Sequence, residues 1–164
     1  MRILCCFILW ALSQVASAEL IQVGAGVARW GPFKVYDAAF LTLADLTLAQ
    51  ALSEHTPARL ELCYARFLSV ADFIAGAERG LPLEFSTELQ QAVQRLHRAY
   101  QPVNQGDCYQ LDFQPEQGTR LLLNGRELVR IDTLGFKALY FSIWLGDAPL
   151  LMGLKGDLTQ GLKP

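Results

Sequence analysis

Residues 24–43 constrain the fold of this chain more than any other stretch. They read GAGVARWGPFKVYDAAFLTL, and a short turn at residues 30–32 divides them into two apolar runs. Two such runs joined by a tight turn predict an antiparallel β-hairpin. Because few polar residues remain for a solvated face, we expect little of the hairpin to be exposed and its charged residues, Arg29, Lys34 and Asp37, to need partners.

The N-terminus has the pattern of a secretory signal peptide. Met1 and Arg2 form a positive start, residues 3–12 are apolar, and residues 15–18 (VASA) supply the small side chains of a cleavage site. The apolar run is much shorter than the roughly 20 residues that span a bilayer. We therefore expect residues 1–18 to be removed, no transmembrane segment after that removal, and a periplasmic or secreted protein.

Length and charge limit the organisation and the partners. A chain of 164 residues can form one domain with a real core but not two ordinary domains, so we expect a single domain over residues 19–164, and a monomer. The net charge is −2, and no Lys/Arg run of the kind that binds anionic lipid or nucleic acid appears. These features argue against nucleic acid as a partner.

Two cysteines, Cys63 and Cys108, remain once the predicted signal peptide is removed. The alternation of apolar residues places each on the more polar side of a predicted strand. In an oxidising compartment the pair could form a disulfide if the two strands are neighbours, or stay as two separate half-buried thiols. The sequence leaves both possibilities open.

The rest of the chain carries strand and helix patterns in turn. Period-two alternation and turn signals predict strands at residues 59–67, 108–113, 119–123 and 126–131. Apolar stripes at helical spacing predict helices at residues 70–79, 87–100, 134–145 and 149–158, with a short helical turn within residues 42–57. The predicted class is α+β, an antiparallel sheet with a layer of helices over one side.

The dipeptide Asn124-Gly125 is the strongest hairpin signal in the chain. As a type I′ turn it predicts that Leu121 lies opposite Leu128 on one face of the sheet. On the other face, Leu122 is then expected opposite Glu127.

Conventional catalytic and metal-binding sets are missing from the sequence. His55, in a predicted loop, and His97, on the expected exposed side of a helix, have no second His or Cys at ligand spacing. Residues 24–26 (GAG) lack the third glycine and the helix of a dinucleotide site, and favour a close backbone approach or a bulge. We expect no metal and no cofactor.

Arg29 is the strongest candidate for ligand binding. Its guanidinium offers two parallel donors to a carboxylate or an enolate-like oxygen and stays charged at any accessible pH. It could instead pair with Asp37, or lie at the solvent end of the turn beside Trp30.

Four more side chains are candidates for the same site. Tyr36 and Thr42 could add hydroxyl contacts to a ligand, and Tyr140 and Trp144 could line an apolar cavity. Aromatic residues in strands and helices more often pack in the core, so each also has a purely structural interpretation.

Five short motifs follow one another along residues 24–154: G-x-G-x-x-R, F-K-V-Y-x-A, L-E-L-x-Y-A-R, G-T-R-x-x-L-N-G and a helix ending in I-W-L-G-D. Together they resemble the bacterial chalcone isomerase-like proteins. The resemblance implies the chalcone isomerase fold, an open-faced β-sandwich with a large antiparallel sheet and a layer of helices.

In that superfamily, plant enzymes close a chalcone into a flavanone, and relatives bind fatty acids. Arg29 matches the arginine that faces the anionic oxygen of the ligand in those proteins. The enzyme's tyrosine and lysine, one helical turn apart, would fall within residues 68–72, which read LSVAD and contain neither. The threonine that follows the family's arginine has no clear match, because the turn at residues 30–32 is shorter.

Three functions follow as hypotheses. The first is a secreted, non-catalytic protein that binds an apolar carboxylate such as a fatty acid, and its expected ligand contacts are Arg29, Tyr36, Thr42 and Tyr140. The second is an intramolecular lyase of chalcone isomerase type, an isomerase in which Arg29 stabilises an oxyanion. The third is a structural or interaction module of the cell envelope without a small ligand. The absence of an acid/base pair favours the first.

Overall fold

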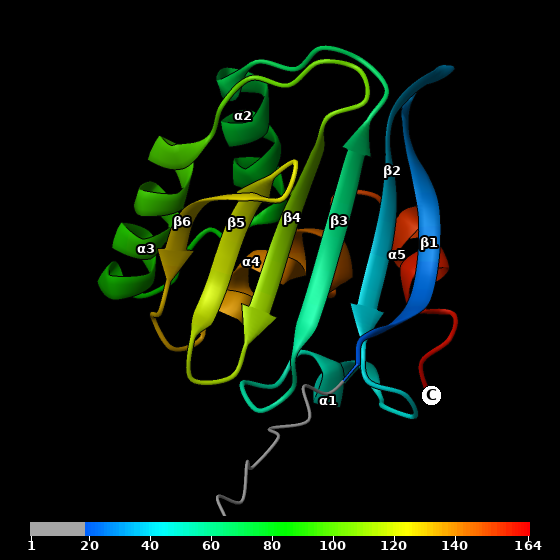
Figure 1. Ribbon diagram of the computed structural model, residues 1–164, viewed down its shortest axis with the longest axis vertical. Helices are drawn as coiled ribbons and strands as arrows, with labels where there is room; N and C mark the ends of the chain where they lie inside the picture. Colours follow the sequence, from blue (N-terminus) through cyan, green and yellow to red (C-terminus); the bar gives the residue numbers. More distant parts are fainter. Residues whose placement is uncertain (1–18) are drawn as a thin grey trace, which may run out of the picture.

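One six-stranded antiparallel sheet forms the body of the protein (Figure 1). The computed structural model describes residues 19–164, so the predicted signal peptide lies outside the described residues. The strands lie side by side in sequence order: β1 (Ile21–Trp30), β2 (Phe33–Thr42), β3 (Ala58–Tyr64), β4 (Cys108–Gln114), β5 (Gly118–Leu123) and β6 (Arg126–Ile131).

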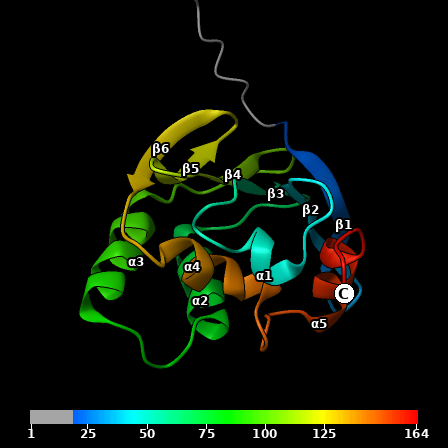
Figure 2. The same cartoon turned by 90° about the horizontal axis from the view of Figure 1, so that it is seen from below.

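The helices of the described residues lie on one side of this sheet (Figure 2). They are α1 (Leu48–Ala51), α2 (Val70–Gly80), α3 (Thr87–Ala99), α4 (Phe136–Leu145) and α5 (Met152–Thr159). The predicted α+β class with a single helical layer is confirmed.

Period-two alternation explains which face of the sheet the helices cover. In β3, the residues Ala58, Leu60, Leu62 and Tyr64 are all at most 5% exposed, and their neighbours in sequence point to the other face. The strand ends at Tyr64, three residues before the predicted end.

The first hairpin has the predicted topology but not the predicted burial. Gly31, in the turn between β1 and β2, adopts a φ of +57°, a conformation that favours glycine. On the face away from the helices, Val27 is 39% exposed and its cross-strand neighbour Asp37 is exposed too. The expectation of little solvated surface was wrong, because no described element covers that face (Figure 2).

The charged residues of the hairpin contradict one of the alternatives predicted for Arg29, in which it pairs with Asp37. Asp37 forms an exposed ion pair with Lys34, with 2.6 Å between Nζ and Oδ2. Arg29 donates instead to the carbonyl of Pro32 at 3.4 Å. The alternative in which Arg29 pairs with Asp37 is therefore wrong.

Cys63 and Cys108 form a disulfide. They lie directly opposite each other on β3 and β4, with 4.1 Å between their Cα atoms. Of the two possibilities that the sequence left open, the structure has the bridge, which joins two central strands.

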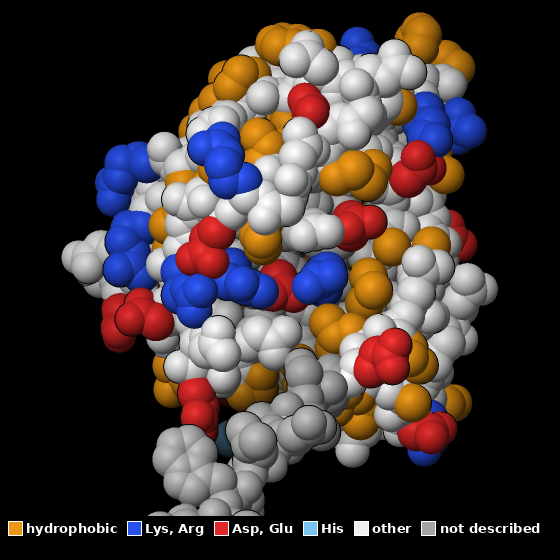
Figure 3. Space-filling view, in the orientation of Figure 1, with side chains coloured by type: hydrophobic (Ala, Val, Ile, Leu, Met, Phe, Trp, Pro, Cys, Tyr) orange, Lys and Arg blue, Asp and Glu red, His pale blue; other side chains and the backbone are white. Residues whose placement is uncertain are grey.

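Charged pairs cross the same uncovered face (Figure 3). Nε of Arg59 donates to Oδ1 of Asp112 at 2.9 Å, and Arg120 contacts the other carboxylate oxygen. Asp112 is fully buried, so the two arginines supply the partners that a buried carboxylate requires.

The hairpin of β5 and β6 departs from the predicted register at one position. Leu122 lies opposite Glu127 as predicted, but Leu121 lies opposite Val129 rather than Leu128. A register shift between Leu121 and Leu122 adds one residue to β6, which is the geometry of a β-bulge.

Two glycines of β1 allow α5 to lie against the strand (Figure 1). A Cβ added at Gly24 would lie 2.2 Å from the backbone oxygen of Leu158, and one at Gly26 would lie 2.7 Å from Cβ of Asp157. A register shift also occurs between Gln22 and Gly24. Both the predicted close backbone approach and the predicted bulge are confirmed.

Candidate ligand-binding site

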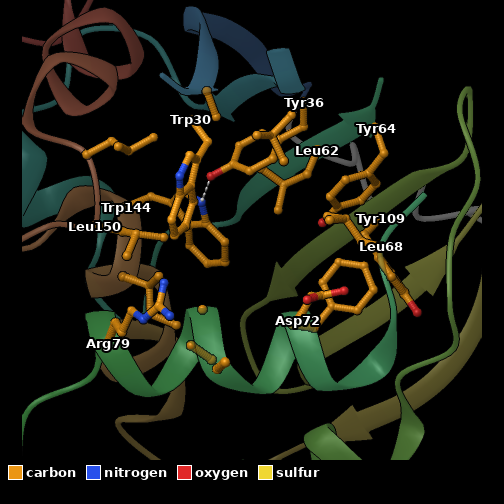
Figure 4. A pocket seen from close by; sticks show the side chains of 18 of the residues that line it. Trp30, Tyr36, Leu62, Tyr64, Leu68, Asp72, Arg79, Tyr109, Trp144 and Leu150 are labelled. Atoms are coloured by element: carbon orange, nitrogen blue, oxygen red, sulfur yellow. Dashed lines mark hydrogen bonds between the residues drawn. The ribbon is translucent and has the colours of Figure 1, made fainter. Parts of the chain in front are cut away.

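A cavity of about 750 Å³ lies between the sheet and helices α2 and α4 (Figure 4). This volume is within the range of small-molecule pockets, about 300 to 1,000 Å³. The walls come from β1 to β5, from both helices and from residues 150–151, and they are mostly apolar or aromatic. A largely apolar small molecule is therefore the ligand class that the cavity suits.

Small side chains on α2 keep the cavity open. Ala75, Gly76 and Ala77 follow one another along its wall. A Cβ added at Gly76 would meet no atom within 4 Å. The half-buried Gly76 thus leaves space on this wall of the cavity that a larger side chain would fill.

A cluster of aromatic rings lines the cavity, and Tyr64 is at its centre. The Tyr64 ring centroid lies 5.6 Å from that of Tyr36, 5.3 Å from that of Phe73 and 6.1 Å from that of Tyr109, each in an edge-to-face arrangement. Tyr36 and Tyr64 are cross-strand neighbours on β2 and β3. Interlocked rings of this kind hold the wall rigid.

The hydroxyl groups of these tyrosines differ in their partners. Tyr36 accepts a hydrogen bond from Nε1 of Trp144 at 3.1 Å, the dashed contact in Figure 4. Tyr109 donates to the carbonyl of Gln101 at 2.8 Å. Burial raises the pKa of Tyr64 well above 10, which keeps its hydroxyl protonated and able to donate. A ligand oxygen could therefore accept from Tyr64.

Exposed residues of the lining mark the mouth of the cavity. Arg29 and Trp30 of β1 and Arg79 of α2 all line it and are all exposed. The Arg79 guanidinium lies 5.6 Å from the centroid of the Trp30 ring, which ties the two elements together across the opening. Neither Arg29 nor Arg79 forms an ion pair with a described residue. Arg66 also lines the cavity but lies near Asp72. Arg29 and Arg79 are thus the two arginines available to an anionic group at the mouth.

Asp72 is an acidic residue of the lining, and it has a structural role. It completes the capping box of α2, where it accepts from the backbone nitrogen of Ser69 at 2.8 Å and from the Ser69 hydroxyl at 2.7 Å. These hydrogen bonds lower the pKa of Asp72. A carboxylate held in this way is a poor proton acceptor.

The other predicted ligand residues divide between the cavity and the core. Tyr36 and Trp144 line the cavity. Thr42 does not, because it lies at the far end of β2, where its buried hydroxyl donates to the carbonyl of Pro57 at 3.0 Å. Tyr140 is fully buried behind the wall, and its hydroxyl bonds that of Tyr100 at 2.7 Å. The predicted ligand roles of Thr42 and Tyr140 were therefore wrong.

Sequence reasoning missed Tyr64 and Arg79. Tyr64 could have been found, because it lies within the predicted strand at residues 59–67 and alternates onto the same face as Leu60 and Leu62. Arg79 could not, because only the packing of α2 against the hairpin brings it to Trp30.

His97 is half-buried, contrary to the predicted exposed position. Its Nε2 is buried without a partner among the described residues, and its ring packs 6.1 Å from that of Tyr140. Burial lowers the pKa of His97, with an opposing effect from Glu78. The residue does not line the cavity.

Two further features of residues 19–164 bear on function. No group of three or more His, Cys, Asp or Glu side chains is placed to hold a metal ion. None of the helices in that range is both long enough and apolar enough to cross a bilayer.

Comparison with known proteins places the chain in a family. A family model described as chalcone isomerase-like matches residues 10–159. The chain belongs to the chalcone isomerase-like family. No curated protein matches the sequence.

A solved structure shares the fold of this chalcone isomerase-like chain. It is the crystal structure of a fatty-acid binding protein of Arabidopsis thaliana, with a TM-score of 0.62 and 12% sequence identity. The match covers 90% of this chain and 89% of that chain. At this identity the likeness concerns the fold, and it agrees with the open-faced sheet and helical layer described above.

Proposed function

We propose that the chain is a non-catalytic binding protein that holds an apolar carboxylate, such as a fatty acid, in the cavity between the sheet and α2. The observation that carries the proposal is the combination of apolar walls with two arginines at the mouth that have no carboxylate partner among the described residues. The hydrocarbon chain would lie inside, and the head group would meet Arg29 and Arg79.

The titratable groups of the cavity favour binding over catalysis. General acid/base catalysis requires a group whose pKa lies near the working pH. The pKa of Asp72 is lowered by its capping hydrogen bonds, and burial raises the pKa values of Tyr36 and Tyr64. No histidine lines the cavity. The Arabidopsis structure is that of a fatty-acid binding protein, which supports the same ligand class.

We further propose that the protein acts as a monomer in the periplasm or outside the cell. The disulfide between Cys63 and Cys108 supports an oxidising compartment. The cavity is enclosed by elements of one chain, so ligand binding needs no second copy.

Isothermal titration with dodecanoate tests the proposed site. The wild type should bind, and Arg29→Gln should weaken binding about 10-fold or more, because a hydrogen bond to a charged group contributes about 1.5–3 kcal/mol. Arg98→Gln, at an exposed arginine of α3 outside the cavity, is the matched control and should bind like the wild type. Dodecan-1-ol, which lacks the charge, should bind more weakly than dodecanoate.

A wild type that ignores dodecanoate would count against the proposal. Equal affinities for Arg29→Gln and wild type would remove Arg29 from the site. Cyclisation of an added chalcone that falls sharply in Arg29→Gln would favour the lyase instead.

A further inference from the structure

Three large apolar side chains are exposed at one end of the sheet. Trp30, Phe33 and Phe67 are 69%, 62% and 59% exposed. Trp30 and Phe33 face each other across the hairpin turn. The segment that carries Phe67 is joined to the hairpin through the backbone hydrogen bond from Ala65 to Val35, at 2.8 Å. A cluster of exposed aromatic residues on a soluble domain is a mark of an interaction site.

Basic side chains surround this aromatic tip. Arg29 and Lys34 are cross-strand neighbours at the base of the turn. Arg66 precedes Phe67, and Arg79 contacts Trp30. Although the sequence has no Lys/Arg run and the chain as a whole carries a net charge of −2, the fold gathers four basic residues here from three segments.

Acidic residues at the tip are fewer, and their charges are already engaged. Asp37 is paired with Lys34, and Asp72 caps α2 while lying near Arg66. Asp107, beside Tyr64 at the same end of the sheet, accepts hydrogen bonds from Asn104 and Asn124. The tip is therefore positive on a chain that is negative overall.

The same tip forms the rim of the cavity. Trp30, Phe67, Arg66 and Arg79 all line the cavity as well as being exposed. Other exposed apolar residues, such as Leu134, which is 78% exposed, do not line it. Of the three exposed aromatic residues, Trp30 and Phe67 therefore lie at the mouth of the cavity, and Phe33 lies beside it, opposite Trp30.

We propose that Trp30, Phe33 and Phe67, with the basic residues around them, form a docking surface for an anionic lipid bilayer. Tryptophan side chains favour the headgroup level of a bilayer, and each nearby Lys or Arg is attracted to anionic lipid. The positive charge of the tip fits a surface rich in phosphate. Because Trp30 and Phe67 also line the cavity, docking through them would turn the mouth of the cavity toward the lipid. Docking goes beyond ligand binding and does not depend on the proposed ligand.

Vesicle flotation tests the docking surface. The protein, with its N-terminus determined by mass spectrometry, should float with phosphatidylcholine vesicles that contain 30% phosphatidylglycerol, and much less with phosphatidylcholine alone. High salt should release it. Arg66→Gln should weaken the apparent affinity about five-fold, since one basic residue contributes about 1 kcal/mol near an anionic surface. Phe33→Ala should also weaken it about five-fold, because it removes one of the three exposed aromatic side chains. Leu134→Ala is the control and should float like the wild type, because Leu134 is apolar and even more exposed but follows β6 at the opposite end of the sheet.

A fluorescence measurement gives an independent readout. In a Trp144→Phe variant, Trp30 is the one tryptophan of residues 19–164. Phospholipids brominated on the acyl chains should quench its emission on anionic vesicles. Absence of flotation, flotation equal in Phe33→Ala and wild type, or unquenched Trp30 would each overturn the proposal. A dimer in analytical ultracentrifugation that disappears in Phe33→Ala would overturn it too, because the tip would then be a contact between copies.

Discussion

At the scale of single residues, the site depends on where a few charged groups lie. Arg29 was predicted either as a ligand anchor, as a partner of Asp37 or as a residue at the solvent end of the turn beside Trp30, and it is exposed at the cavity mouth next to Trp30, where the Pro32 carbonyl accepts from it. This position leaves its guanidinium available to an entering anion. Arg79 reaches the same mouth from a helix, where its guanidinium lies 5.6 Å from the centroid of the Trp30 ring.

Residue identity alone did not separate cavity residues from core residues. Thr42 and Tyr36 lie on the same strand and the same face, but at opposite ends of β2, and only the Tyr36 end is open. Tyr140 and Trp144 are one turn apart on α4, and only Trp144 reaches the cavity. The pattern predicts which face a side chain takes, whereas the depth of packing decides whether it meets a ligand.

His97 gives a prediction about pH and stability. Burial lowers its pKa in the folded protein below the usual value of about 6.5, so the unfolded chain binds the proton more tightly. Stability should therefore fall as the pH decreases below about 6.5. Urea unfolding at pH 7 and pH 5 should show a larger loss in wild type than in His97→Leu. A loss of the same size in both proteins would contradict the assignment to His97.

At the scale of elements, alternation and helical spacing predicted nearly every strand and helix. Ser69 caps α2 and Ser86 caps α3, where their side chains accept from the backbone nitrogens of Asp72 and Leu89. Two features were missed because they depend on pairing between strands. One is the bulge that places Leu121 opposite Val129, and the other is the exposure of β1 on a face that no described element covers.

The contact between β1 and α5 gives a prediction at this scale. Gly24→Ala should destabilise the protein by about 1–3 kcal/mol, because the new Cβ would overlap the backbone oxygen of Leu158, which a side-chain rotation cannot move. Chemical denaturation measures the change.

Gly156→Ala is the matched control for this variant. It lies on α5 itself, and its added Cβ would meet no atom within 4 Å. Replacing glycine inside a helix should leave stability unchanged or raise it by about 0.5–1 kcal/mol. Equal stabilities for Gly24→Ala and wild type would mean that α5 does not pack on β1 as described.

At the scale of the whole molecule, the cavity exists because the two layers do not fill the space between them. Large aromatic residues on β2 to β4 form one wall, and α2 presents small residues opposite them. The sequence predicted both layers, and the family resemblance predicted a ligand between them. The sequence could not give the volume of the cavity. That volume depends on the separation of the sheet and α2, on the absence of a side chain at Gly76 and on the small side chains next to it.

The most direct measurement is ligand binding to a variant in which the cavity is filled. Gly76→Leu adds a side chain into open space and replaces a glycine within a helix, so its melting temperature should equal or exceed that of the wild type. Gly156→Leu adds the same side chain to α5, outside the cavity, as the control. Dodecanoate should bind the wild type and Gly156→Leu alike and should bind folded Gly76→Leu at least 10-fold more weakly. Undiminished binding by folded Gly76→Leu would contradict a ligand site between the sheet and α2.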